Sequence, residues 1–82
     1  MGLKKLAAKV ADYNDRLESG KTSKIKPEDV NKVLKKLRAK EASLATEMSE
    51  ARDPDEKARL QRKRAIAREH ISLAEWLLSE IA

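Results

Sequence analysis

The sequence predicts an all-α, up-down-up bundle of three helices in one domain, residues 1–82. Two long helices should form an antiparallel, coiled-coil-like hairpin, and a shorter N-terminal helix should pack on the C-terminal half of the last one. The composition is typical of long helices, with two glycines and no phenylalanine in 82 residues. Apolar residues recur at alternating spacings of four and three, which is the pattern of a heptad row along one side of a helix. Proline and glycine divide these rows into three segments.

The first helix is expected at about residues 3–18. Its heptad row consists of Leu3, Leu6, Val10, Tyr13 and Leu17. Gly20 follows, and glycine is the residue that most often ends a helix, because it adopts the left-handed conformation without strain.

The second helix is expected at about residues 27–51. Pro27 suits a first helical position, where its missing N–H has no partner to lose, and Glu28 and Asp29 place negative charge at the positive end of the helix dipole. The row of this helix consists of Val30, Leu34, Leu37, Glu41, Leu44, Met48 and Ala51.

The third helix is expected at about residues 54–80. Asp53 precedes Pro54 as an N-cap, and Glu56 stands three residues after it, as in a capping box. The row of this helix consists of Leu60, Arg64, Ala67, Ile71, Ala74, Leu78 and Ile81. Since the connection at residue 53 is short, the second and third helices should be antiparallel neighbours.

The two long rows define a register, because facing residues of an antiparallel pair have a nearly constant sum of residue numbers. Leu44 with Leu60 gives 104, and Glu41 with Arg64 gives 105. The only charged residues of the two rows therefore share a layer, and we predict a Glu41–Arg64 ion pair. This polar layer is either a surface pair at the edge of the row or a buried pair that fixes the register.

The first helix matches a second row of the third helix with a constant offset of 60, as parallel neighbours do. The matched pairs are Leu6 with Ile66, Val10 with His70, Tyr13 with Leu73 and Leu17 with Leu77. His70 is thus expected to be a packed structural residue. Ile25, in the connector, should pack against Leu78 and Ile81.

This arrangement leaves the hairpin tip uncovered, so Leu44, Met48 and Leu60 are expected to be half exposed and to be candidates for an interface. Trp76 lies roughly opposite the row that meets the second helix. It is either an interface anchor or a side chain shielded by the first helix.

The net charge is +5, and the segment from Lys57 to Arg68 holds six basic residues and no acidic one. Basic surplus favours acidic partners such as nucleic acid. In this alternative the phosphate contacts would come from Lys57, Arg62, Lys63, Arg64 and Arg68, with Lys4, Lys5 and Lys9 of the first helix. These charges do not gather on one side of the helix, so a nucleic-acid role is not favoured.

No catalytic, cofactor-binding or metal-binding residues are indicated. The chain has no cysteine and one histidine, and no nucleophile–base pair or phosphate-binding loop is evident. Neither a membrane span nor a signal peptide is indicated, so a cytoplasmic protein without a membrane partner is expected.

The leading functional hypothesis is therefore a non-enzymatic helical module for protein interaction or oligomerisation. Its expected partner is a second copy of the chain, in a homodimer, or another helical protein. The alternative is a small basic protein associated with nucleic acid. The biological process is not indicated by any motif.

Overall fold

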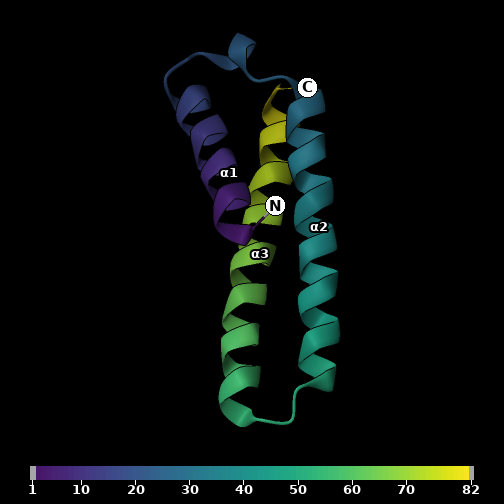
Figure 1. The fold of residues 1–82 in the computed structure, drawn as a ribbon. Helices are drawn as coiled ribbons and strands as arrows, with labels where there is room; N and C mark the ends of the chain where they lie inside the picture. Colours follow the sequence, from purple (N-terminus) through teal and green to yellow (C-terminus); the bar gives the residue numbers. More distant parts are fainter. Residues whose placement is uncertain (1, 82) are drawn as a thin grey trace.

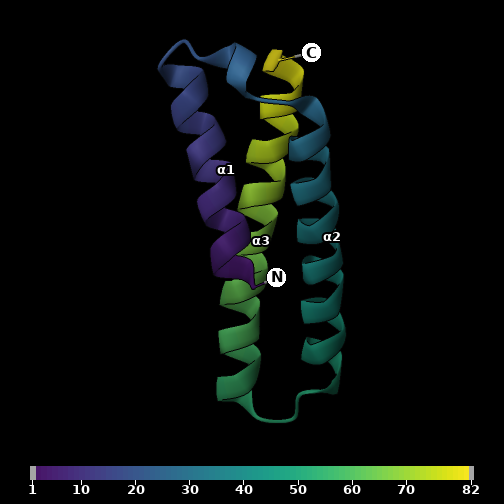
Figure 2. The same ribbon diagram turned by 45° about the horizontal axis from the view of Figure 1, so that its top comes forward.

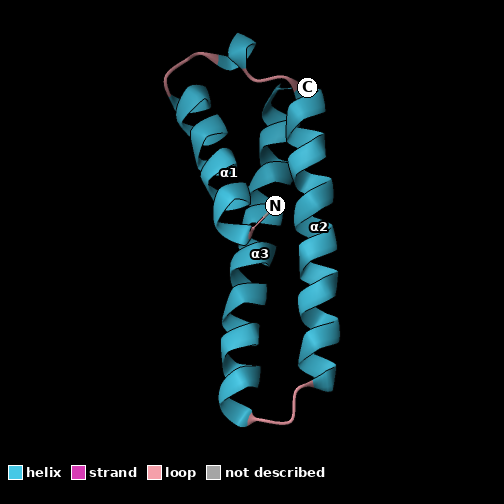
Figure 3. Ribbon diagram, in the orientation of Figure 1, coloured by secondary structure: helices cyan, strands magenta, loops and turns pink. Residues whose placement is uncertain are grey.

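The computed structural model describes residues 2–81, and these form three α-helices and one short 3₁₀ turn (Figure 3). The predicted domain ends, Met1 and Ala82, lie outside the described residues. Helix α1 spans Leu3–Glu18, the turn η1 spans Thr22–Lys24, α2 spans Pro27–Glu50 and α3 spans Pro54–Ile81. The helices begin and end within one residue of the predicted bounds.

The molecule is an elongated up-down-up bundle with extents of 47 × 19 × 18 Å. Helices α2 and α3 run antiparallel along its whole length, while α1 runs parallel to α3 beside its C-terminal half (Figures 1 and 2). Below the N-terminus of α1, α2 and α3 continue as a two-helix arm (Figure 1). The predicted fold class is confirmed.

The turn between α2 and α3 is capped by Asp53. Its carboxylate Oδ1 accepts a hydrogen bond of 3.1 Å from the N–H of Asp55, and its carbonyl accepts the N–H of Lys57 at 3.0 Å. The bond to the carboxylate comes from Asp55 and not from Glu56, and within residues 2–81 no hydrogen bond returns from the Asp53 N–H to Glu56, so the predicted N-cap forms without the predicted capping box. The N-cap alone satisfies one of the free N–H groups at the start of α3.

Helix α1 ends in a Schellman motif at Gly20. The Gly20 N–H donates to the carbonyl of Leu17 at 3.1 Å, and the Lys21 N–H donates to the carbonyl of Arg16 at 2.8 Å. Gly20 has φ of +74°, the left-handed conformation that this motif requires.

Replacing Gly20 by alanine should lower the free energy of unfolding by about 1 kcal/mol, because a Cβ disfavours the left-handed conformation. A Cβ at this position would meet no atom within 4 Å, so the loss is conformational and not steric. Urea denaturation measures it. Gly20→Asn is the control, since asparagine tolerates this conformation and should lose much less. Equal losses for the two variants would contradict this explanation.

The core consists of two clusters of buried side chains. The larger one lies where all three helices meet and includes Leu6, Val10, Ile25, Val30, Val33, Leu34, Leu37, Ala74 and Leu77. Ile25, from the connector, is buried there, and Leu78 and Ile81 pack against the same cluster, as predicted. Val33 is outside the predicted row of α2, and its burial marks a second side of α2 that lies against α1.

The smaller cluster closes the arm. It consists of Leu44, Leu60 and Ala67, with Leu3, Met48 and Ala51 packed against it. The expectation that Leu44 and Leu60 are half exposed is wrong, since their exposed fractions are 2% and 8%. The two leucines cover each other across the hairpin, and Leu3 at the start of α1 closes the cluster from above. Of the three predicted arm residues, Met48 alone is partly exposed.

The predicted contact row between α1 and α3 is also partly wrong. Leu77 is fully buried, but His70 and Leu73 are partly exposed, and Ile66 is 43% exposed. Helix α1 packs on both α2 and α3, so its apolar row points into the groove between them. The alanines Ala67 and Ala74 line that groove on α3, and Ile66 is left at its outer margin.

Candidate interaction surfaces

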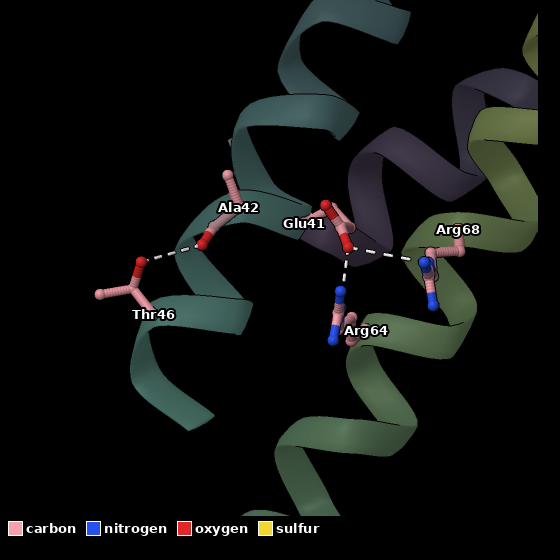
Figure 4. Close-up of polar contacts among 5 residues, drawn as sticks. All are labelled: Glu41, Ala42, Thr46, Arg64 and Arg68. Carbon is pink, nitrogen blue, oxygen red and sulfur yellow. Dashed lines mark hydrogen bonds and ion pairs between the residues drawn. The ribbon is translucent and has the colours of Figure 1, made fainter. Parts of the chain in front are cut away.

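Glu41 joins α2 to α3 through two arginines (Figure 4). The Nε of Arg64 donates to Glu41 Oε1 at 2.7 Å, and the Nε of Arg68 lies 3.7 Å from the same oxygen. The side chains of Glu41 and Arg64 are 23% and 32% exposed. The predicted ion pair is thus confirmed, and it lies at the edge of the hairpin seam, partly but not fully buried.

A double-mutant cycle with Glu41→Ala and Arg64→Ala should give a coupling free energy of about 0.5–1 kcal/mol, reduced in high salt, because the pair is partly solvated. Thermal or urea unfolding of the four proteins measures it. The pair of Arg38 and Glu75 is the control: its N–O distance is 3.9 Å and its side chains are 60% and 53% exposed. We expect a coupling free energy near zero for this control pair. Equal coupling in the two cycles would show that partial burial does not strengthen the Glu41–Arg64 pair.

The outer face of α3 carries the largest exposed apolar groups of the described residues. Ile66 is 43% exposed and Trp76 is 45% exposed, and the partly exposed Leu73 lies between them. The hypothesis that α1 shields Trp76 is therefore wrong. Because α1 lies in the groove toward α2, this side of α3 is left open to solvent.

A cleft of about 420 Å³ lies at the N-terminus of α1. Its floor is apolar, with Leu3, Ala7 and Ile66, and its rim carries one lysine from each helix. These lysines are Lys4 of α1, Lys40 of α2 and Lys63 of α3. Among the residues that the structure describes, no acidic side chain lines this cleft, so the site is suited to an anion or to an acidic side chain.

A second basic cleft lies between α1 and α2. Lys9, Lys32 and Lys36 line it together with Tyr13 and Asp29. Burial raises the pKa of the Tyr13 phenol, and the nearby Asp29 carboxylate raises it further. Lys36 of this cleft and Lys40 of the first are one helical turn apart, so Lys32, Lys36 and Lys40 form a row along α2 that reaches both clefts, here called the basic band.

The structure does not bring the predicted phosphate contacts together. Arg64 and Arg68 both contact Glu41, whereas Lys63 belongs to the lysine cleft. Lys57 and Arg62 are exposed but lie about 140° apart around α3. The predicted set is thus divided among three sides of the helix.

The lysines of α2 are the residues that sequence reasoning missed. Lys32, Lys36 and Lys40 are spaced by four, which places them in one row, but any solvated helix face offers such rows. Their meeting with Lys4, Lys9 and Lys63 depends on where α1 packs. No signal in the sequence places α1 over this side of α2 except the apolar Val33.

The ring Nδ1 of His70 lies 2.8 Å from the carbonyl oxygen of Ile66, so Nδ1 carries the proton and the imidazole is held on its own helix. Among the described residues, no group of three or more histidine, cysteine or acidic side chains is arranged to hold a metal ion.

The chain matches no known protein-family model, and searches of curated proteins and of solved structures found no similar protein. None of the helices formed by residues 2–81 has the length and apolar character needed to cross a membrane.

Proposed function

We propose that the chain is a non-enzymatic helical interaction module that binds another protein through the outer face of α3. The proposal includes the cytoplasmic location expected from the sequence. The observation that carries it is the exposure of Trp76 and Ile66 on the side of α3 that faces away from the two core clusters.

Exposed tryptophan is the stronger part of this argument. Tryptophan buries a large apolar area and offers an N–H donor, and it is enriched among the residues that dominate binding energy at interfaces. Folding of the bundle does not require Trp76 to face inward, because the core at this level is already closed by Ala74 and Leu77. Trp76 shares this side of α3 with the exposed Ile66 and the partly exposed Leu73, and apolar groups gathered on one exposed face favour a partner.

The arm is a weaker candidate for the same role. Leu44 and Leu60 are buried within it, so they offer no apolar surface to a partner. Met48 remains partly exposed in a shallow cleft with Arg64 and Arg68. One methionine beside a polar layer presents less apolar area than the outer face of α3.

Photo-cross-linking in cells that express the chain tests this function. A photoreactive phenylalanine derivative replaces Trp76, and the same group replaces Lys35, which is exposed on α2 on the side away from α1 and α3. We expect defined protein adducts from position 76 and only background from position 35. Equal background at both positions would refute the proposed role of this face.

A second candidate function is the binding of nucleic-acid phosphates, and the basic band favours it over the basic run of α3. Replacement of Lys4, Lys40 and Lys63 by glutamine should lower the dependence of DNA affinity on salt by roughly two to three units of the log–log slope. Replacement of Lys21, Lys26 and Lys35 changes the net charge equally and serves as the control. If both triple variants lose DNA affinity equally, the net charge alone explains binding, and the basic band is not a specific phosphate-binding site.

A further inference from the structure

The outer face of α3 carries a second heptad row, distinct from the one that meets α2. Its spacings are four, three, four, three and four, and at about 100° per residue its members lie within an arc of about 80°. The row consists of Arg62, Ile66, Glu69, Leu73, Trp76 and Glu80. All six side chains are exposed except Leu73, which is partly exposed. Three of its members, Ile66, Leu73 and Trp76, are apolar, and its two ends carry opposite charges.

We infer that a second copy of this chain docks on this row in antiparallel orientation, α3 against α3, about a two-fold axis. The inference rests on the proposed function and names its partner. In an antiparallel pair centred at residue 71, the numbers of two facing residues add up to 142. Each member of the row then faces another member of the same row in the second copy, and the first member faces the last. Ile66 faces Trp76 of the second copy, and Arg62 faces Glu80 of the second copy. Self-complementarity of this kind is what a two-fold interface requires.

Charge selects the antiparallel orientation. A parallel pair would place Arg62 against Arg62, Glu69 against Glu69 and Glu80 against Glu80, and like charges that face each other oppose association. The antiparallel pair instead joins opposite charges at both ends of the row. Within the described part of the chain, neither Arg62 nor Glu80 forms an ion pair, so both are available to the second copy.

The central layer pairs Leu73 with Glu69 of the second copy, and this happens twice about the axis. The methylene groups of Glu69 can cover the partly exposed Leu73 while the carboxylate remains in water at the edge of the seam. Two layers of Ile66 and Trp76 flank this centre. The apolar contact is therefore concentrated in residues that are the most exposed large hydrophobic groups of the monomer.

Helix α1 supplies an independent check of the same axis. Leu3 and Ala7 line one cleft with Lys63 and Ile66, and α1 runs parallel to α3 from there on (Figure 1), so residues of α1 lie level with residues of α3 about 60 positions later. Ala11 is then level with residue 71, the centre of the proposed pair. The row on α1 that borders the outer face of α3 is Lys4, Ala7, Ala11, Asn14 and Glu18.

About the axis set by α3, this row on α1 also faces itself with complementary charge. Ala11 faces Ala11 of the second copy, and Lys4 faces Glu18 of the second copy. Alanine at the axis lets two helices approach closely. One axis thus satisfies the charges of two helices, and the dimer contains an antiparallel four-helix arrangement of α1 and α3 from each copy.

Charge reversal tests both the partner and the orientation. Sedimentation equilibrium should find the full chain as a dimer, and Arg62→Glu and Glu80→Arg should each weaken it at least about tenfold, because each places like charges together at both ends. An equimolar mixture of the two variants should form a heterodimer as stable as the wild-type dimer, since both of its ends join opposite charges. The double variant should dimerise like the wild type. Circular dichroism checks that each variant remains helical.

Trp76 is the only tryptophan of the chain, so its fluorescence reports burial of this face directly. Dilution of the wild type should shift the emission to longer wavelength, in step with dissociation. A wild-type protein that stays monomeric, or a dimer unaffected by the single reversals, overturns the inference. A monomer that still forms adducts from position 76 with a different protein rejects the dimer and retains the interaction module, whereas failure of both experiments rejects both.

Discussion

Replacing Leu37 by alanine is expected to lower the free energy of unfolding by about 3 kcal/mol. Leu37 is fully buried in the cluster where all three helices meet, and it packs there with Val10 of α1 and Leu77 of α3. The loss combines the transfer free energy of the removed methyl and methylene groups with the cavity that remains, since three helices cannot all close on one smaller side chain. For a domain of this size the midpoint of thermal unfolding should fall by about 12–24 °C.

Calorimetry or urea denaturation measures this effect. Leu78→Ala is the matched control. It removes the same atoms from a partly exposed leucine of α3, so it should lower the free energy of unfolding by about 1 kcal/mol or less. Leu37→Met, which nearly conserves volume, should recover most of the stability. A loss for Leu37→Ala no larger than that for Leu78→Ala would mean that the bundle does not close around Leu37.

Enlarging Ala67 to leucine is expected to destabilise the protein by about 2–3 kcal/mol through overpacking. Ala67 has no exposed surface and packs with Leu44 and Leu60 where the arm joins the three-helix region. Three additional carbon atoms there must displace one of these leucines or move α2 away from α3. Either movement also disturbs the polar layer at Glu41, which lies one residue layer away along the seam.

Ala58→Leu is the control for this substitution. Ala58 is exposed on α3, so leucine there should change the free energy of unfolding by less than about 0.5 kcal/mol. Chemical denaturation of the two variants at protein concentrations below self-association compares them. Tolerance of leucine at both positions would show that α2 and α3 are farther apart at Ala67 than the structure has them.

The helix limits and the register of the hairpin could be predicted because their causes are local or pairwise. Pro27 and Pro54 begin helices through their fixed backbone, and Gly20 ends one through its freedom at positive φ. The ion pair of Glu41 and Arg64 followed from matching two rows of equal period. Two antiparallel helices have one relative shift to determine, and the rows contain enough large and small residues to specify it.

The burial of Leu44 and Leu60 and the exposure of Ile66 could not be predicted in the same way. Each depends on where a third helix lies relative to a pair, and α1 could pack on α3 alone or in the groove between α2 and α3 with nearly the same apolar row. In the structure α1 packs in the groove, because Val33 of α2 and the alanines of α3 together give α1 more contact than α3 alone would. Ile66 and Trp76 are left outside as a consequence.

The sequence by itself determined three helices, their ends, the antiparallel pairing of α2 with α3 and the ion pair within it, because these follow from backbone sterics and from rows that repeat along one dimension. Only the tertiary structure decided which surfaces remain. The packing of α1 gathered Lys4, Lys40 and Lys63 around one cleft and left the heptad row of α3 facing solvent. The exposed surface consists of the side chains that remain in water after the three helices have packed together. It therefore depends on the positions of all three helices and cannot be derived from the apolar row of any one of them.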